Sequence, residues 1–112
     1  MPIKTIDSRT LKAWLEKDEA FVIDVREPHE YHLAHIPSAT LIPLATLSAE
    51  GLPDHEGKKR VVHCQHGKRG TLACERLVIA DPTLEIYHLE GGLAAWINAG
   101  YSVSESLSAV LE

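Results

Sequence analysis

Cys64 is the residue of this chain that is best placed to do chemistry. It ends the apolar run 60–64 and opens the segment Gln65-His66-Gly67-Lys68-Arg69, which leads to Gly70. We predict that a strand ends at Cys64, that a tight loop follows and that a helix begins near Gly70. Backbone amides from Gln65 to Gly70 would then converge on Sγ and, with the helix N-terminus, favour the thiolate. The pattern predicts a nucleophilic cysteine.

Neighbouring residue types support this prediction. Gly67 allows the unusual backbone angle that a tight concave loop needs. Lys68 and Arg69 add positive charge, and His63 and His66 are further candidate cations. Cysteine is also common as a small buried apolar residue. The position at a strand end, beside a glycine and two cations, favours the nucleophile over that simpler interpretation.

Short apolar runs alternate with helical patterns along the chain. Strands are predicted at 21–25, 41–42, 60–64 and 84–89. Helices are predicted around Leu11, Trp14 and Leu15, with Ser8 as the cap, around 73–78, and around 93–97 with Ile97 on the buried face. This alternation predicts one α/β domain with a mostly parallel sheet of about four or five strands and helices on both faces. Ligands of such sheets bind beyond the carboxyl ends of the strands, where Cys64 lies.

Composition narrows the function classes. The 112 residues suit one domain, with 45% hydrophobic residues for its core. A formal net charge of −5 argues against a broad nucleic-acid surface, and no apolar stretch has the length of a membrane helix. Two cysteines are too few for a disulfide framework. We therefore expect a cytoplasmic protein without nucleic-acid partners.

Three signatures in order resemble the rhodanese family of sulfurtransferases. The loop from His63 to Arg69 resembles the active loop of that family. The segments on either side resemble its first and closing signatures: Asp24-Val25-Arg26 with Glu30 and His35-Ile36-Pro37-Ser38-Ala39, then Leu89-Glu90-Gly91-Gly92-Leu93 with Trp96 and Gly100. The resemblance covers about residues 3–101, which is essentially the whole domain.

The resemblance implies a single rhodanese-like domain over 1–112, with a core at about 3–101 and a C-terminal tail at 102–112. It implies that Cys64 takes a sulfane sulfur from a small anionic donor such as thiosulfate and holds it as a persulfide. A thiol, cyanide or a protein acceptor then removes the sulfur. Gln65, His66, Gly67, Lys68 and Arg69 would surround the persulfide. Asp24, Arg26 and Glu30 would support the loop, with an Arg26–Glu30 ion pair, and no cofactor is implied.

Some residues depart from the family pattern. Ala34 and Ser38 replace frequent glycines and Leu41 replaces a frequent asparagine, which concerns the geometry of turns rather than the chemistry. His66 leaves donor preference open. The segment 42–53 is similar to bacterial rhodanese domains that precede two transmembrane helices. Because Leu111-Glu112 resembles an expression-vector remnant, the sequence leaves open whether the natural chain continues.

Two other functions have to be weighed. Cysteine phosphatases and arsenate reductases also place Cys before a glycine-containing anion loop. The phosphatases need one residue more between Cys and Arg than the four found here, and Gly70 stands where their arginine would be. A non-catalytic scaffold is the second alternative, although inactive versions typically lack the cysteine. A mass shift on Cys64 after incubation with thiosulfate separates a sulfur carrier from a scaffold.

The remaining candidates have simpler explanations. Spacings of three residues between His29, His32 and His35 do not make a firm zinc pattern, so we expect no metal site. Cys74 falls about one turn into the predicted helix, on its apolar side. Its Cα should lie roughly 10 Å from that of Cys64, beyond the ~7 Å limit for a disulfide. We therefore expect Cys74 to be a core residue and not a redox partner.

Overall fold

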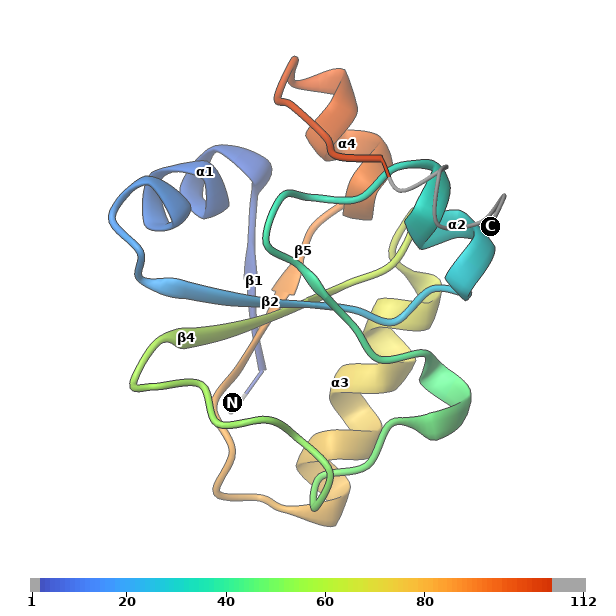
Figure 1. Cartoon of the computed structure of the whole chain (residues 1–112). Coiled ribbons are helices and arrows are strands. Elements are labelled where there is room, and N and C mark those ends of the chain that lie inside the picture. The colour runs from blue at the N-terminus through green and yellow to red at the C-terminus, as the bar shows by residue number, and fades with distance from the viewer. Residues whose placement is uncertain (1–2, 106–112) are drawn as a thin grey trace.

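Five parallel strands form the central sheet of the computed structural model, which describes residues 3–105 (Figure 1). The strands lie in the order β1-β5-β4-β2-β3. Their bounds are β1 Ile3–Ile6, β2 Ala20–Asp24, β3 Thr40–Leu41, β4 Lys59–His63 and β5 Ile86–Leu89. All four strand pairings are parallel. This α/β architecture confirms the predicted fold class.

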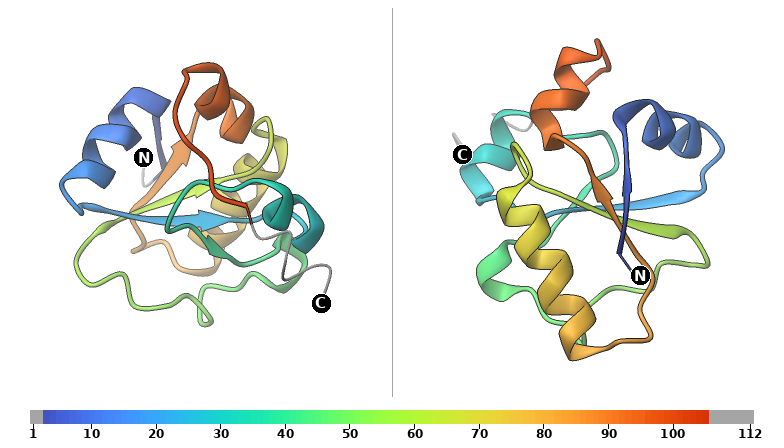
Figure 2. Two further views of the ribbon diagram at one scale, coloured as in Figure 1. Left: turned by 45° about the horizontal axis from the view of Figure 1, so that its top comes forward. Right: turned by 180° about the vertical axis from the view of Figure 1, so that it is seen from behind.

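Helices cover both faces of this sheet. α3 (Lys68–Ala80) lies on one face, and α1 (Ser8–Glu16) and α4 (Gly92–Asn98) lie on the other (Figures 1 and 2). α2 (Pro28–Leu33) follows the carboxyl end of β2, and the short 3-10 turn η1 (Leu44–Thr46) follows β3. The carboxyl ends of β2 and β4 are therefore followed by α2 and by the loop that leads into α3.

The core has two layers because strand side chains alternate between the faces. Val22 and Val61 pack with the buried residues of α1 and α4. Ile23 and Val62 pack on the opposite face with those of α3. Cys64 belongs to this second layer, so its side chain points toward α3.

The first helix begins differently from the prediction. Asp7, not Ser8, caps α1, because its carboxylate accepts a hydrogen bond from the Thr10 amide at 2.8 Å. Ser8 is the first helical residue and is buried. An aspartate satisfies a free amide of the first turn as well as a serine does, so the two adjacent candidates could not be separated by type alone.

Several element bounds also differ from the sequence prediction. α2 was not predicted; it has Pro28 at its start and a reciprocal cap between Glu27 and Glu30. β1 was not predicted. α3 begins at Lys68 rather than near Gly70, and the predicted strands shift by one or two residues. Ile97, predicted to be buried, is 47% exposed, since α4 buries Leu93 and Trp96 instead.

The described part of the tail lies against the body of the domain. His35 and Ser104 form an antiparallel bridge, with N···O distances of 2.9 and 2.8 Å. The Trp96 indole N–H donates to the Ser102 carbonyl oxygen at 2.9 Å. Our expectation for Leu111-Glu112 lies outside the described residues. Within 3–105, each helix is too short or too polar to span a bilayer.

Candidate active site

Cys64 follows the last residue of β4 at the carboxyl edge of the sheet. Its side chain is only 1% exposed, and Sγ accepts a hydrogen bond from the Gly67 amide at 3.0 Å. A backbone N–H directed at sulfur stabilises the thiolate relative to the thiol. Gly67 is the only one of the loop amides in the described chain that donates to Sγ, whereas several were expected to converge there.

The loop needs glycine at position 67. Gly67 has φ of 136°, a value that side-chain-bearing residues rarely adopt. Directly after it, α3 runs for 13 residues from Lys68, so the positive end of the helix dipole lies at the loop. The predicted sequence of strand, loop and helix is therefore present, with the helix starting two residues earlier than expected.

The first turn of α4 holds the loop from the other side. The Leu93 amide donates to the Cys64 carbonyl oxygen at 2.9 Å, and the Ala94 amide donates to the Gln65 carbonyl oxygen at 3.0 Å. Gly92 makes this approach possible. A Cβ there would collide with the Cys64 carbonyl oxygen and would lie 2.7 Å from the Gln65 carbonyl carbon. The close passage of the two backbones therefore requires glycine at position 92.

A buried ion pair supports Gln65. Arg26 is 2% exposed and Asp24 is fully buried, and the guanidinium binds both carboxylate oxygens at 2.8 to 3.1 Å. Its remaining donors reach the Gln65 side-chain oxygen at 3.0 Å and the Ala34 carbonyl oxygen at 2.6 Å. Arg26 thus ties β2, the segment after α2 and the cysteine loop together.

Glu30 pairs with the cysteine loop and not with Arg26, so the predicted Arg26–Glu30 ion pair is wrong. The two Arg69 nitrogens donate to the two Glu30 carboxylate oxygens at 2.6 and 3.0 Å. This bond is the main reason why the pKa of Glu30 falls from 4.5 to about 2. Arg26 pairs with Asp24 instead of Glu30 because Asp24 is fully buried and needs a partner inside the domain. Glu30 on α2 faces the start of α3, where Arg69 lies.

Two histidines lie beneath the loop: His63, which was expected to add positive charge, and His88, which was not predicted to be near the site. His63 is fully buried, with Nδ1 3.0 Å from the Cys64 carbonyl oxygen. Burial lowers its pKa, although Asp24 opposes this shift, so His63 does not supply the positive charge that we expected. His88 of β5 lies under Gly70, where an added Cβ would be 2.7 Å from Nε2. Because side chains alternate along a strand, His88 could have been predicted to share the face of β5 on which Ile86 packs against α3.

The other loop residues differ in exposure. His66 and Lys68 are exposed, and the Arg69 side chain is 37% exposed. Ser38, which replaces a frequent glycine, adopts φ of 71° in the left-handed region that favours glycine. Ala34 has an ordinary extended backbone. Of these two departures, only Ser38 therefore places a side chain in a glycine-type turn.

Cys74 is a core residue, as predicted. It is fully buried in α3 within the same apolar layer as Cys64, and both cysteines are free thiols. Burial raises the pKa of Cys74 to about 12, and the nearby Cys64 contributes. Cys74 is therefore a poor nucleophile compared with a thiol that receives a backbone hydrogen bond.

His29, His32 and His35 do not converge on one point. The His35 ring stacks on Tyr31 with the centroids 3.8 Å apart, and its Nδ1 lies 2.8 Å from the Tyr31 carbonyl oxygen. Over residues 3–105, no group of three or more His, Cys, Asp or Glu side chains is arranged to hold a metal ion.

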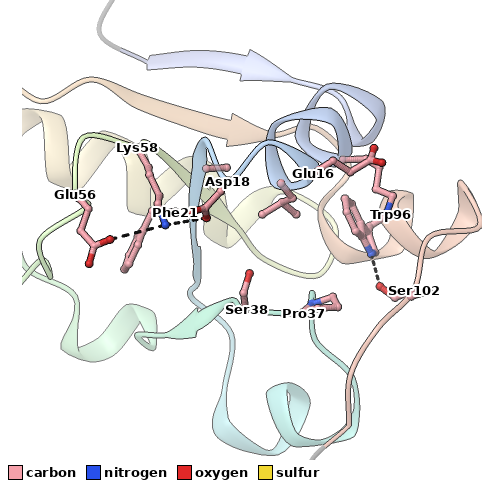
Figure 3. Close-up of a pocket in the computed structure, with 12 residues that line it drawn as sticks. Glu16, Asp18, Phe21, Pro37, Ser38, Glu56, Lys58, Trp96 and Ser102 are labelled. Carbon is pink, nitrogen blue, oxygen red and sulfur yellow. Dashed lines mark hydrogen bonds and ion pairs between the residues drawn. The ribbon is translucent and has the colours of Figure 1, made fainter.

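Figure 3 shows a pocket of about 450 Å³, none of whose lining residues belongs to the cysteine loop. It is lined by the end of α1, the start of β2, the Pro37-Ser38 turn and α4. Lys58 binds Asp18 at 2.9 Å in its wall, and Trp96 is turned toward Ser102. Ala20 begins β2, whereas Cys64 follows the opposite end of β4, so this pocket belongs to the other end of the sheet.

Comparisons with known proteins agree with this geometry. The family described as the rhodanese-like domain matches residues 7–99. An uncharacterised protein of Synechocystis sp. is 42% identical over 96 residues, which are 86% of this chain and 53% of that protein. The probable adenylyltransferase/sulfurtransferase MoeZ of Mycobacterium tuberculosis is 36% identical over 95 residues, 82% of this chain and 24% of MoeZ. The chain thus spans about half or less of these longer relatives.

Shorter relatives match along most of their length. The thiosulfate sulfurtransferase GlpE of Pseudoalteromonas translucida is 26% identical over 102 residues, which are 91% of this chain and 95% of GlpE. The crystal structure of a rhodanese-related protein from Thermoplasma volcanium aligns with a TM-score of 0.76 at 33% identity, covering 90% of this chain and 97% of that one. The chain therefore belongs to the rhodanese-like domain family, whose named members include sulfurtransferases.

Proposed function

We propose that this domain transfers sulfane sulfur through a persulfide on Cys64. The observation that carries the proposal is the hydrogen bond from the Gly67 amide to Sγ at the start of α3. An amide and a helix N-terminus that stabilise a thiolate also stabilise a terminal persulfide sulfur, because both are singly charged sulfur anions. The loop serves the cysteine before and after it is loaded.

The proposed reaction has two balanced halves. In loading, the Cys64 thiolate attacks the outer sulfur of thiosulfate. The Sγ–S bond forms as the S–S bond of thiosulfate breaks, and sulfite leaves with the bonding electron pair. In unloading, cyanide or an acceptor thiolate attacks the outer sulfur, and Cys64 departs as the thiolate. Gln65 to Arg69 line the path of the transferred sulfur, and Asp24 and Arg26 hold that loop in place.

The phosphatase alternative is less well supported. Arg69 is committed to Glu30 by two hydrogen bonds. At the next position, a side chain in place of Gly70 would have its Cβ 2.7 Å from His88 Nε2, so an arginine there would require His88 to move. A scaffold without catalysis would not need the hydrogen bond that Sγ receives.

The proposal also covers the extent of the domain, its donor and acceptor, and the compartment in which it acts. We propose that 1–112 acts as one rhodanese-like domain, that its donor is a small anionic sulfur compound, and that its acceptor is a thiol, including a thiol on a protein partner. We place this reaction in the cytoplasm, because both cysteines are free thiols and an acceptor thiol has to be reduced.

Intact and peptide mass spectrometry tests the proposed function directly. The purified protein is incubated with thiosulfate and weighed with and without reductant, beside a Cys64→Ser control. We expect the wild type to gain one sulfur atom on the peptide that contains Cys64, and to lose it on reduction. A wild type that gains no sulfur, or one loaded mainly on Cys74, would contradict the proposal, and aryl phosphate turnover would then favour a phosphatase.

A further inference from the structure

Donor loading sets an electrostatic requirement at Cys64. Thiosulfate carries two negative charges, and the attacking thiolate carries a third. Charges of the same sign that meet in a partly buried site need nearby cations. Arg26 is 2% exposed, and its donors are used by Asp24, Gln65 and Ala34, so it does not meet the donor.

Arg69 is the cation that the fold places at the loop in an ordered position, and it is already bound. Both of its terminal nitrogens donate to Glu30, at 2.6 and 3.0 Å. The bond pairs two parallel donors with two acceptors, which is the geometry in which a guanidinium also binds an oxyanion of a substrate. Glu30 therefore occupies the face of Arg69 that a thiosulfate oxygen would use.

Glu30 is held in that position by its own helix. The Glu27 amide donates to Glu30 Oε1 at 3.0 Å, as part of the reciprocal cap at the start of α2. The pKa of Glu30 is about 2, chiefly because of the hydrogen bond from Arg69, so the carboxylate stays charged at physiological pH. The side chains of Arg69 and Glu30 are 37% and 22% exposed, so a donor can reach the pair.

We propose that Glu30 determines donor choice: by occupying Arg69 it disfavours dianionic inorganic donors and favours organic persulfides, R–S–SH. This inference rests on the proposed sulfur transfer through Cys64. In a persulfide the sulfane sulfur is bonded to the sulfur atom of an organic group, and no oxyanion is attached to it. It can therefore react without a free guanidinium at the loop.

Charge balance distinguishes the two loading steps. With thiosulfate, the thiolate and the donor bring three negative charges together, and a persulfide anion and sulfite dianion are formed. With R–S–SH, the thiolate attacks the terminal sulfur, the Sγ–S bond forms, the original S–S bond breaks and R–S⁻ leaves with the electron pair. The proton stays on the transferred sulfur, so the protonated donor adds no charge to that of the thiolate. Its anion, R–S–S⁻, would add one charge, which is still one fewer than thiosulfate adds.

The test compares Glu30→Gln with the wild type in rapid-quench mass spectrometry, using two donors. One donor is thiosulfate and the other is the persulfide of N-acetylcysteine methyl ester, whose carrier thiol has no other charge. We expect the loading constant for thiosulfate to rise about three- to tenfold, as one partly exposed charge-assisted pair is lost. The faster loading should come from a lower half-saturating concentration of thiosulfate. The loading constant for the persulfide donor should stay within about twofold of the wild-type value.

Glu27→Gln is the matched control. It removes an equal charge from the exposed start of the same helix and keeps an oxygen acceptor for the cap, and within residues 3–105 the carboxylate that binds Arg69 is that of Glu30 and not that of Glu27. We expect both donors to load this variant as they load the wild type. Faster thiosulfate loading in Glu27→Gln equal to that in Glu30→Gln would overturn the proposal, because net charge would then explain the effect.

A measurement on the wild type makes the test independent of variant folding. Sulfate is a dianion without a sulfane sulfur, and at constant ionic strength it should not slow persulfide loading. Strong inhibition by sulfate, or thiosulfate loading in Glu30→Gln no faster than in the wild type, would contradict the role of Glu30. A wild type that neither donor loads would instead contradict the proposed sulfur transfer itself.

Discussion

Gly92 lies directly against the carbonyl oxygen of Cys64, so that a Cβ at position 92 would collide with this oxygen. The amide that follows, Leu93 N–H, donates to the same oxygen at 2.9 Å. The geometry of the cysteine backbone is thus set by a helix on the opposite face of the sheet from α3.

Gly92→Ala should damage both stability and the site. The collision adds to a φ of 61°, and we expect a loss of about 2–4 kcal/mol in the free energy of unfolding. Gly100→Ala is the control, with φ of 85° and nothing within 4 Å of its Cβ, and it should lose only about 1–2 kcal/mol. Urea unfolding measures both, and equal losses would argue that backbone angle alone matters at Gly92.

Cys64→Ser should abolish sulfur transfer and leave the fold intact. A hydroxyl does not ionise at neutral pH, so the Gly67 amide would have no anion to stabilise. Thiosulfate:cyanide turnover and far-UV circular dichroism measure the two effects. Substantial turnover in a folded variant would rule out Cys64 as the nucleophile.

Lys68→Ala should slow thiosulfate loading more than unloading, because loading brings in the more highly charged partner. Arg69→Ala should do the same, because it leaves the Glu30 carboxylate unpaired at the loop. Lys68 is exposed, and the Arg69 side chain is 37% exposed and paired with Glu30, so water screens both charges. We therefore expect each substitution to raise the loading barrier by about 1 kcal/mol, which is roughly a fivefold change in rate. Stopped-flow measurement of each half-reaction, with Lys12→Ala as a remote cation control, decides the matter. Equal slowing of the loading and unloading half-reactions would show that these two charges do not act specifically in loading.

The Glu30–Arg69 pair should make stability depend on acid. Because folding lowers the pKa of Glu30 from 4.5 to about 2, the native state holds fewer protons than the unfolded state between these values. The stabilisation is present above about 4.5 and is lost as the pH falls toward 2, and we expect about 1 kcal/mol for this partly exposed pair. Urea unfolding of wild type and Glu30→Gln should converge as pH falls, and a constant difference would contradict this assignment.

Cys74→Ala should retain sulfur transfer and lose only about 1 kcal/mol of stability, since little volume is removed. A thiol whose pKa is raised to about 12 should also stay unoxidised under mild conditions. Treatment with stoichiometric peroxide followed by peptide mapping tests this: sulfenic acid on Cys64 alone is expected. A dominant Cys64–Cys74 disulfide would make the protein a redox switch instead.

The fold was predictable where single segments carry strong patterns. The apolar runs at β2 and β4 and the loop with Gly67 were enough to place Cys64 at a strand end. β1 was missed because its four residues alternate weakly, with exposed Lys4 and Thr5 between Ile3 and Ile6. α2 was missed because it has only 6 residues and begins at a proline, which is common in turns as well as in the first turn of a helix.

The pairing of charges was not predictable in the same way. Asp24, Arg26 and Glu30 were each identified, but which carboxylate Arg26 meets depends on the burial of Asp24 and the direction of α2. Both are tertiary properties. His63 shows the same limit: its position beside Cys64 suggested a cation, and only its full burial shows why its pKa falls.

Arg26 joins two requirements in one side chain. Replacing it would leave the Asp24 carboxylate without a partner inside the core and would release Gln65 and Ala34 at the same time. The Cys64 side chain is also buried, in the layer against α3, but its sulfur accepts a hydrogen bond from a single loop amide, that of Gly67. A change at the Cys64 sulfur therefore disturbs one neighbouring amide, whereas a change at Arg26 uncovers a buried charge and frees two other segments of the chain at once.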